Sequence, residues 1–307
     1  MKIAVISDIH GNLPALRAVT HDVEAWEPDI VVVNGDIVNR GPLSLACLRF
    51  VQDKQQHNGW HVVKGNHEDF LLECGRKGAP KCGPDYELTQ FAYWSMQQLN
   101  GHLASLAALP DKFVWIAPDG SEFRVVHASM INNRDGIYPQ VTDEKLWRQI
   151  APVPAVFVTA HTHRPMIRRF NDSLVVNVGS VGAPFDGDHR ASYGRFQWTH
   201  DGWETEIIRL PYDIAQTERD YVESGFLHEA GPLAQLMLVE LRRAGGLIYR
   251  WAKRYQDAVL AGEISMEASV QELLSDEDLR PFLGPPISIS GDQPVSISAF
   301  QAVSLTS

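Results

Sequence analysis

The feature that most constrains the fold is an apolar run at residues 31–36 that ends in a carboxylate. Val31, Val32 and Val33 are consecutive β-branched residues, which predicts a buried strand. Gly35 then lets the backbone turn, and Asp36 follows at the sheet edge, where open α/β folds keep their chemistry. A Gly-Asp pair alone is typical of an ordinary turn. The functional interpretation rests on four other predicted strand ends, which also finish in Asp, Asn or His.

The order of the predicted elements indicates a layered α/β domain. Strands at residues 2–7, 30–34 and 60–64 alternate with segments that carry apolar residues at helical spacing, which is a βαβαβ order. A helix is expected over 87–109. Further strands are expected at 112–117 and 122–127 as a hairpin, at 155–159 and 174–178, and at 193–199 and 203–210 as an antiparallel pair. We expect that antiparallel pair to complete a second sheet.

The pattern changes at residue 212. We predict one domain over 1–211, a helical extension over 212–280 with helices at 213–223, 233–244 and 247–260, and a tail of low charge over 281–307. The extension carries a local basic cluster: Arg242, Arg243, Arg250, Lys253 and Arg254. A solvated helix face is the favoured interpretation of this cluster. A partner-binding or self-association surface formed by the C-terminal helices is the alternative.

The net charge limits the classes of binding partner that we expect. The chain has 27 Lys and Arg against 38 Asp and Glu, a net charge of −11, which disfavours non-specific binding to nucleic acid and docking on anionic lipid. Three cysteines cannot all pair within one chain, and the sequence opens directly into a strand, so a cytoplasmic location is expected. Apolar runs stay below the ~18 residues that a membrane-spanning helix needs.

The polar residues at the strand ends form a ligand set of oxygen and imidazole donors without thiolates. They are Asp8, His10, Asp36, Asn66, His127, His161 and His163. Such a set suits divalent transition metals, with manganese expected first and iron, zinc, cobalt or nickel as alternatives. Seven ligands suit two ions that share one carboxylate, for which Asp36 is the candidate. Two ions about 3.5–4 Å apart can clamp a phosphoryl group, with a bridging hydroxide as the nucleophile.

These blocks, in this order, resemble the calcineurin-like metallophosphoesterases. The resemblance spans residues 1–210 and rests on five separated blocks: Asp8-x-His10, Gly35-Asp36 with Arg40-Gly41, Gly65-Asn66-His67-Glu68, His127, and His161-Thr162-His163. The segment 177–182 is similar to one in compact bacterial phosphodiesterases of this superfamily. The resemblance implies a four-layer α/β/β/α sandwich of two mixed sheets, followed here by the C-terminal helical extension.

The resemblance also implies a role for each residue. Asp8, His10 and His163 would hold the first ion, Asn66, His127 and His161 would hold the second, and Asp36 would bridge. His67 would stabilise the transition state or protonate the leaving oxygen, and Arg40 would bind the substrate phosphate. Two positions depart from the pattern. Asn39 replaces an aspartate that orients the catalytic histidine, which favours His67 as a hydrogen-bond donor, and Ala160 replaces a glycine before His161.

The resulting hypothesis is a dinuclear-metal-dependent phosphoester hydrolase. It would be a phosphodiesterase or phosphatase that acts on a small phosphoester, with nucleotides among the candidate substrates. Arg40-Gly41 keeps a dinucleoside polyphosphate hydrolase or a Ser/Thr protein phosphatase open as alternatives. A non-catalytic metal-binding scaffold is the alternative that is not an enzyme. Such a scaffold would not need so complete a ligand set, because a structural metal needs no open position for water.

Overall fold

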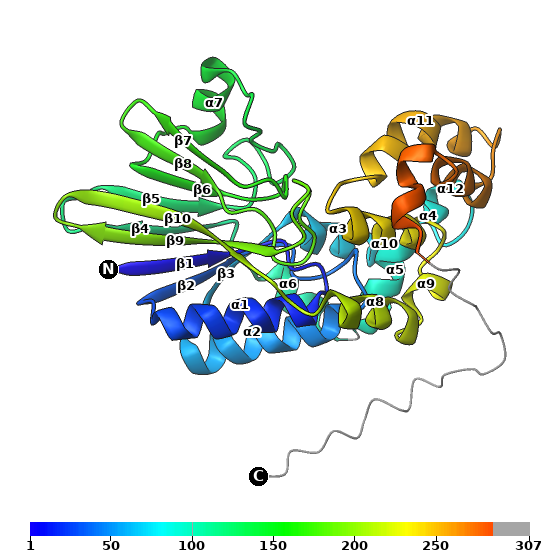
Figure 1. Cartoon of the computed structure of the whole chain (residues 1–307), viewed down its shortest axis with the longest axis horizontal. Coiled ribbons are helices and arrows are strands. Elements are labelled where there is room, and N and C mark those ends of the chain that lie inside the picture. Colours follow the sequence, from blue (N-terminus) through cyan, green and yellow to red (C-terminus); the bar gives the residue numbers. More distant parts are fainter. Residues whose placement is uncertain (100, 285–307) are drawn as a thin grey trace, which may run out of the picture.

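Two five-stranded mixed sheets face each other in the structure, a computed structural model that describes residues 1–99 and 101–284 (Figure 1). The first sheet has the order β10-β9-β1-β2-β3 and the second has the order β4-β5-β6-β8-β7. The strands of the first sheet are β1 (Lys2–Ile6), β2 (Ile30–Asn34), β3 (His61–Val63), β9 (Ala191–Thr199) and β10 (Gly202–Leu210). Those of the second are β4 (Lys112–Ile116), β5 (Glu122–Val126), β6 (Val156–Thr159), β7 (Met166–Phe170) and β8 (Ser173–Asn177).

Side-chain alternation along the strands builds the layers. Ile3 and Val5 of β1 point into the core between the sheets, where they meet residues such as Val125 and Val158 of the second sheet. Ala4 and Ile6 point outward and pack under the helices α1 (Leu13–Trp26) and α2 (Ser44–Asn58). The helix α7 (Asp143–Ile150) covers the outer face of the second sheet. The predicted α/β sandwich of two mixed sheets with a helical C-terminal region is therefore confirmed.

The placement of the last two strands corrects one expectation. Strands β9 and β10 were expected to complete the second sheet, but β9 pairs antiparallel with β1, with Ile3 opposite Phe196, and so both belong to the first sheet. The loop after β8 crosses over to the end of β1, where Val181 N–H donates to the carbonyl of Ser7 at 2.9 Å. This crossing places the next strand against the free edge of β1.

Three other segments differ from the expectation. The segment expected as one helix over 87–109 contains the shorter helices α5 (Gln90–Gln98) and α6 (Leu103–Ala107), and Gly101 between them has a φ of +85°. The helix α4 (Pro84–Glu87) precedes them, and α3 (Asn66–Cys74) follows β3. Strand β7 was not predicted because its exposed side chains include Arg169 in an alternating edge pattern. Helix α7 was also not predicted.

The C-terminal extension packs beside the helices of the first sheet, on the right in Figure 1. Its helices are α8 (Ile214–Glu223), α9 (Phe226–Glu229), α10 (Leu233–Arg243), α11 (Ile248–Leu260) and α12 (Met266–Leu274), followed by the 3₁₀ helix η1 (Glu277–Phe282). One apolar cluster runs without a break from Leu16 of α1 through Phe226 to Trp251 of α11. The expected tail over 281–307 lies outside the described residues from position 285 onward.

The basic cluster of the extension is largely paired with acidic side chains. Arg250 contacts Asp276 at 2.6 Å and Asp278 at 2.8 Å, and Arg254 contacts Asp276 at 3.1 Å. Exposed pairs of this kind contribute little stability individually. The expected self-association through these helices stays a prediction. Among the described residues, none of the helices combines the length and the apolar character that crossing a membrane requires.

Candidate metal centre

The seven predicted ligands come together at one edge of the sandwich, beyond the carboxyl ends of parallel strands. In the first sheet β1, β2 and β3 are parallel, and in the second sheet β5, β6 and β8 are parallel. The segments that follow β1, β2, β3, β5 and β6 carry all seven side chains. Six of the seven are identified by the clusters described below, and the seventh, Asn66, contacts two of them through hydrogen bonds.

The loops that carry the ligands have an unusual backbone. The φ angles of Asp8 and His10 are +53° and +48°, and Asp36, His161 and His163 also have positive φ. Non-glycine residues rarely adopt this conformation, and it persists only where surrounding structure enforces it. Backbone hydrogen bonds supply the constraint, because Asp8 N–H donates to Gly35 O at 3.1 Å and His10 N–H donates to Asp36 O at 2.9 Å. Strain of this kind is typical of functional sites.

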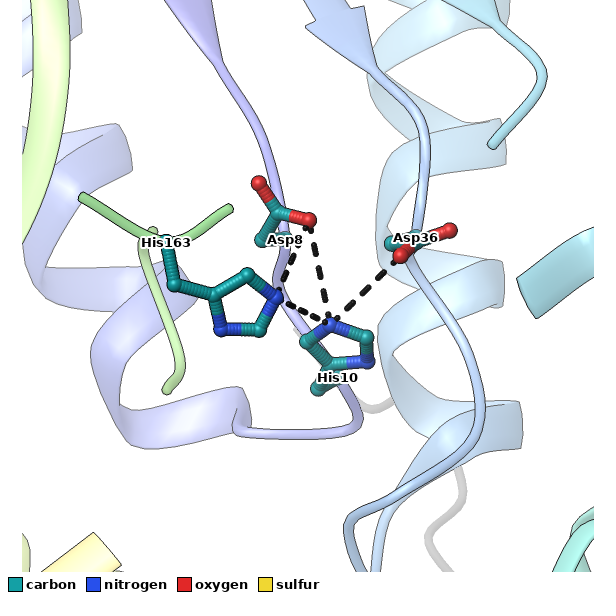
Figure 2. Close-up of side chains that lie close together, drawn as sticks. All are labelled: Asp8, His10, Asp36 and His163. Atoms are coloured by element: carbon teal, nitrogen blue, oxygen red, sulfur yellow. Dashed lines mark hydrogen bonds and ion pairs between the residues drawn. The ribbon is translucent and has the colours of Figure 1, made fainter. Parts of the chain in front are cut away.

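The first cluster consists of Asp8, His10, Asp36 and His163 (Figure 2). Their ligand atoms all lie within 4.8 Å of one another. Nε2 of His10 lies 3.1 Å from Nε2 of His163, which in turn lies 3.3 Å from Oδ1 of Asp8. That oxygen is buried and has no hydrogen-bond partner among the described residues. Because a buried, unpaired carboxylate oxygen facing two imidazole nitrogens is costly, this arrangement fits a bound cation.

Hydrogen bonds at Nδ1 of His10 and His163 determine which nitrogen of each imidazole ring carries the hydrogen. Nδ1 of His10 lies 3.3 Å from the carbonyl of Asn39, and Nδ1 of His163 lies 2.5 Å from the carbonyl of Ala183. A carbonyl only accepts, so Nδ1 carries the hydrogen in each ring and Nε2 keeps its lone pair. Both lone pairs therefore face the cluster, as metal-ligating histidines require.

The second cluster consists of Asp36, His127 and His161, with Asn66 beside them. Oδ1 of Asn66 lies 3.0 Å from Nε2 of His127 and 2.7 Å from Nδ1 of His161. Nε2 of His127 also lies 3.3 Å from Oδ2 of Asp36. Asp36 thus belongs to both clusters, which is the geometry that a bridging ligand needs.

Burial and charge act in opposite directions on the histidines of the second cluster. Burial lowers the pKa of His127, but the Asp36 carboxylate, together with Asp8 and the carbonyl of Asn34, outweighs this effect and raises that pKa to about 10. Burial lowers the pKa of His161 to about 4, and the charge of His127 acts in the same direction. In the protein without metal, His127 is therefore the protonated partner of Asp36.

Residues that the sequence did not single out hold the ligand loops in place. The buried carboxylate of Glu68 accepts the backbone N–H groups of Gly65, Asp36 and Ile37, each at 2.8 Å. Asn177 donates to the carbonyl of Ala160 at 2.7 Å, beside the loop that carries His161 and His163. Glu68 and Asn177 stand in segments that the resemblance included, but sequence alone gave neither a role.

Position 65 must be a glycine because there is no room for a Cβ atom. A Cβ there would lie 2.2 Å from Oδ1 of Asp36 and 2.5 Å from its backbone nitrogen. The loops of β2 and β3 can approach each other only because this Cβ is missing. That approach brings Asp36 beside Asn66 and lets Oδ1 of Asp36 accept the backbone N–H of His67 at 2.8 Å.

The other two residues with a predicted catalytic role lie at the rim of the clusters. The ring of His67 lies edge-on to that of His10, with 4.9 Å between ring centroids, and its Nδ1 lies 2.9 Å from Nδ2 of Asn39. Arg40 forms an ion pair with Glu240 of α10, a partner that the sequence did not indicate. Its guanidinium also lies over the ring of Phe185, 5.6 Å from the centroid.

The family comparison covers most of the sandwich. Residues 1–191 match a protein-family model described as calcineurin-like phosphoesterase. A protein of Methanocaldococcus jannaschii, named only as uncharacterised, is 29% identical over 249 residues, which is 72% of this chain and 92% of that protein. A symmetrical bis(5'-nucleosyl)-tetraphosphatase of Chromohalobacter salexigens is 42% identical, but over 82 residues, which is 26% of this chain and 29% of that enzyme.

A solved structure extends the likeness beyond the sandwich. The crystal structure of a metallophosphoesterase from Sphaerobacter thermophilus is similar to this chain with a TM-score of 0.64 and 28% sequence identity. The match covers 80% of this chain and 99% of that one. Because the sandwich ends at Leu210 and makes up only about two thirds of the 307 residues, a match over 80% of the chain includes part of the C-terminal extension.

Proposed function

The chain belongs to the calcineurin-like phosphoesterase family, and from this premise we propose that it hydrolyses a small phosphoester with the help of two divalent transition-metal ions. The observation that carries the proposal is the position of Asp36, whose carboxylate lies in both clusters. Asp8, His10 and His163 would complete one site, and Asn66, His127 and His161 the other. Manganese is the metal we expect, because oxygen and imidazole donors without sulfur suit it.

The bound ions would supply Lewis-acid activation of water and of a phosphoryl oxygen near neutral pH. The side chains of the protein supply the rest. Water adds to phosphorus, the bond from phosphorus to the leaving oxygen breaks, and the leaving oxygen gains a proton. Asn66 and His67 would offset negative charge on the transferred phosphoryl group through their N–H groups.

The test is a comparison of initial rates on an aryl phosphodiester and an aryl phosphomonoester in Mn²⁺, each with a chelated control. A chelator-sensitive rate on either substrate is the expected result. If neither substrate is hydrolysed at a metal-dependent rate, the proposal is contradicted and the non-catalytic metal-binding scaffold is favoured.

A further inference from the structure

The Arg40 side chain is neutralised by a residue from the C-terminal extension. Arg40 forms an ion pair with Glu240, 200 residues away in the sequence, and their side chains are 13% and 4% exposed. Tyr221 of α8 adds a hydrogen bond from its hydroxyl to the carbonyl of Arg40 at 3.2 Å. The guanidinium that the family resemblance assigns to phosphate binding is therefore tied to the extension by both side chain and backbone.

The Glu240 carboxylate is fixed in position. Its Oε1 accepts the backbone N–H of Leu247 at 2.5 Å and that of Ile248 at 2.8 Å, at the start of α11. Its Oε2 faces Arg40. With both oxygens engaged and the side chain buried, the carboxylate cannot turn away when a substrate arrives.

The pair borders the candidate metal centre. One narrow recess is lined by the metal-ligand candidate His10 together with Arg40, Tyr221, Met237 and Glu240. Phe185 connects the two groups, because its ring stacks on His163 with 4.3 Å between centroids and also lies under the Arg40 guanidinium. A substrate phosphoryl group at the clusters would lie within the field of both charges of the pair.

We propose that Glu240 is a specificity-determining residue that makes the site favour phosphodiesters over phosphomonoesters, an inference that rests on the proposed phosphoesterase function. A lone arginine would attract the second negative charge of a phosphomonoester, whose second ionisation lies near pH 6. The carboxylate of Glu240 offsets that attraction and opposes the second charge. A diester has one charge and is opposed less strongly, so selectivity here comes from a built-in repulsive element.

The same carboxylate should also affect the product of diester hydrolysis. Hydrolysis of a diester adds water, releases one alcohol and leaves a phosphomonoester, which gains a second charge above pH 6. The same carboxylate then opposes retention of that product. We therefore expect one alcohol per diester, with the monoester accumulating rather than being cleaved to inorganic phosphate.

The test uses Glu240→Gln, which keeps an oxygen for the N–H groups of Leu247 and Ile248 but removes the charge. With bis(4-nitrophenyl) phosphate and 4-nitrophenyl phosphate at pH 8, the variant should raise the ratio of monoester to diester kcat/KM about 10-fold. Calorimetry on the metal-loaded protein should show inorganic phosphate binding about 10-fold more tightly, with a clearly smaller gain for dimethyl phosphate. Glu218→Gln is the matched control, because Glu218 pairs with Arg242 in the same extension, at 2.9 Å. It should change neither quantity.

A double variant keeps the inference testable if Glu240→Gln does not fold. Arg40→Gln with Glu240→Gln removes both charges of a neutral pair, so its substrate ratio should stay within about threefold of the wild-type ratio. A 10-fold loss of monoester activity in the double variant would mean that Arg40 binds phosphate as a free cation, which overturns the inference. So would an unchanged ratio in Glu240→Gln, or a wild-type preference for the monoester. Absence of any metal-dependent hydrolysis in the wild type would instead overturn the proposed function.

Discussion

The side-chain amide of Asn39 donates a hydrogen bond to Nδ1 of His67 over 2.9 Å. The orientation of the amide is set by its oxygen, which accepts the backbone N–H of Arg40 at 2.9 Å. Because an amide nitrogen can only donate, Nδ1 of His67 is the acceptor and Nε2 carries the hydrogen. Burial lowers the pKa of His67 to about 3, so the ring is a neutral donor in the protein without metal.

Asn39→Leu should therefore slow turnover about 10-fold while leaving the metal content unchanged, since the ring loses the partner that selects its tautomer. His67→Ala removes the donor itself and should cost roughly 100-fold or more. Initial rates and metal analysis of both variants check this order. If Asn39→Leu has the wild-type rate, the amide does not position His67.

Asp36→Asn should reduce both metal content and turnover. The variant keeps the size of the side chain but halves its capacity to bridge two cations, since an amide has one oxygen. We expect at most one ion per chain by elemental analysis and a rate equal to that of the chelated wild type. Asp188→Asn is the control, because Asp188 pairs with Arg190 at 2.7 Å on the surface. Two ions and full activity in Asp36→Asn would refute the bridging role.

Gly65→Ala should disturb the centre without replacing any of its ligands. The new Cβ would lie 2.2 Å from Oδ1 of Asp36, so the loops of β2 and β3 must separate. Overpacking of this kind costs about 1–3 kcal/mol of stability, and we expect weaker metal binding as well. Gly245→Ala is the matched control, because its Cβ would meet Arg243 at an ordinary 3.5 Å. Equal metal affinity in the two variants would argue against this packing constraint.

Metal binding should compete with a proton on His127. In the metal-free protein its pKa is about 10, raised above 6.5 by Asp36 against the effect of burial, so the ring is protonated at pH 7.5. A metal needs the neutral ring, and each bound ion at this site displaces that proton. Affinity for the second ion should then rise about tenfold per pH unit between pH 7 and 9. Nitrogen NMR of the metal-free imidazoles tests the premise, which a neutral His127 ring at pH 7.5 would exclude.

Much of the sandwich could be predicted from sequence because buried parallel strands are short apolar runs with sharp ends. The run that ends at Asp36 and the run before His161 are both of this kind, and the carboxyl ends of parallel strands necessarily share an edge. The seven ligand candidates lie together at one edge of the sandwich. The positive φ angles of Asp8 and His10 could not be predicted, because they depend on hydrogen bonds from a neighbouring loop.

Long-range partners explain most of what the sequence could not reveal. Glu240 is one acid in an amphipathic helix, and only the fold brings it to Arg40. Strands β9 and β10 form a local hairpin by sequence, but the edge that receives them is decided by the crossing loop at Val181. Glu68 has its role because three backbone N–H groups from two loops meet at its carboxylate.

The measurement that tests the central claim most directly is anomalous X-ray diffraction from crystals of the Mn²⁺-loaded protein. Two manganese peaks should lie on either side of the Asp36 carboxylate, one beside His10 and His163 and the other beside His127 and His161. Their separation should be about 3.5–4 Å. A single peak, or two peaks that do not share Asp36, would contradict the dinuclear centre.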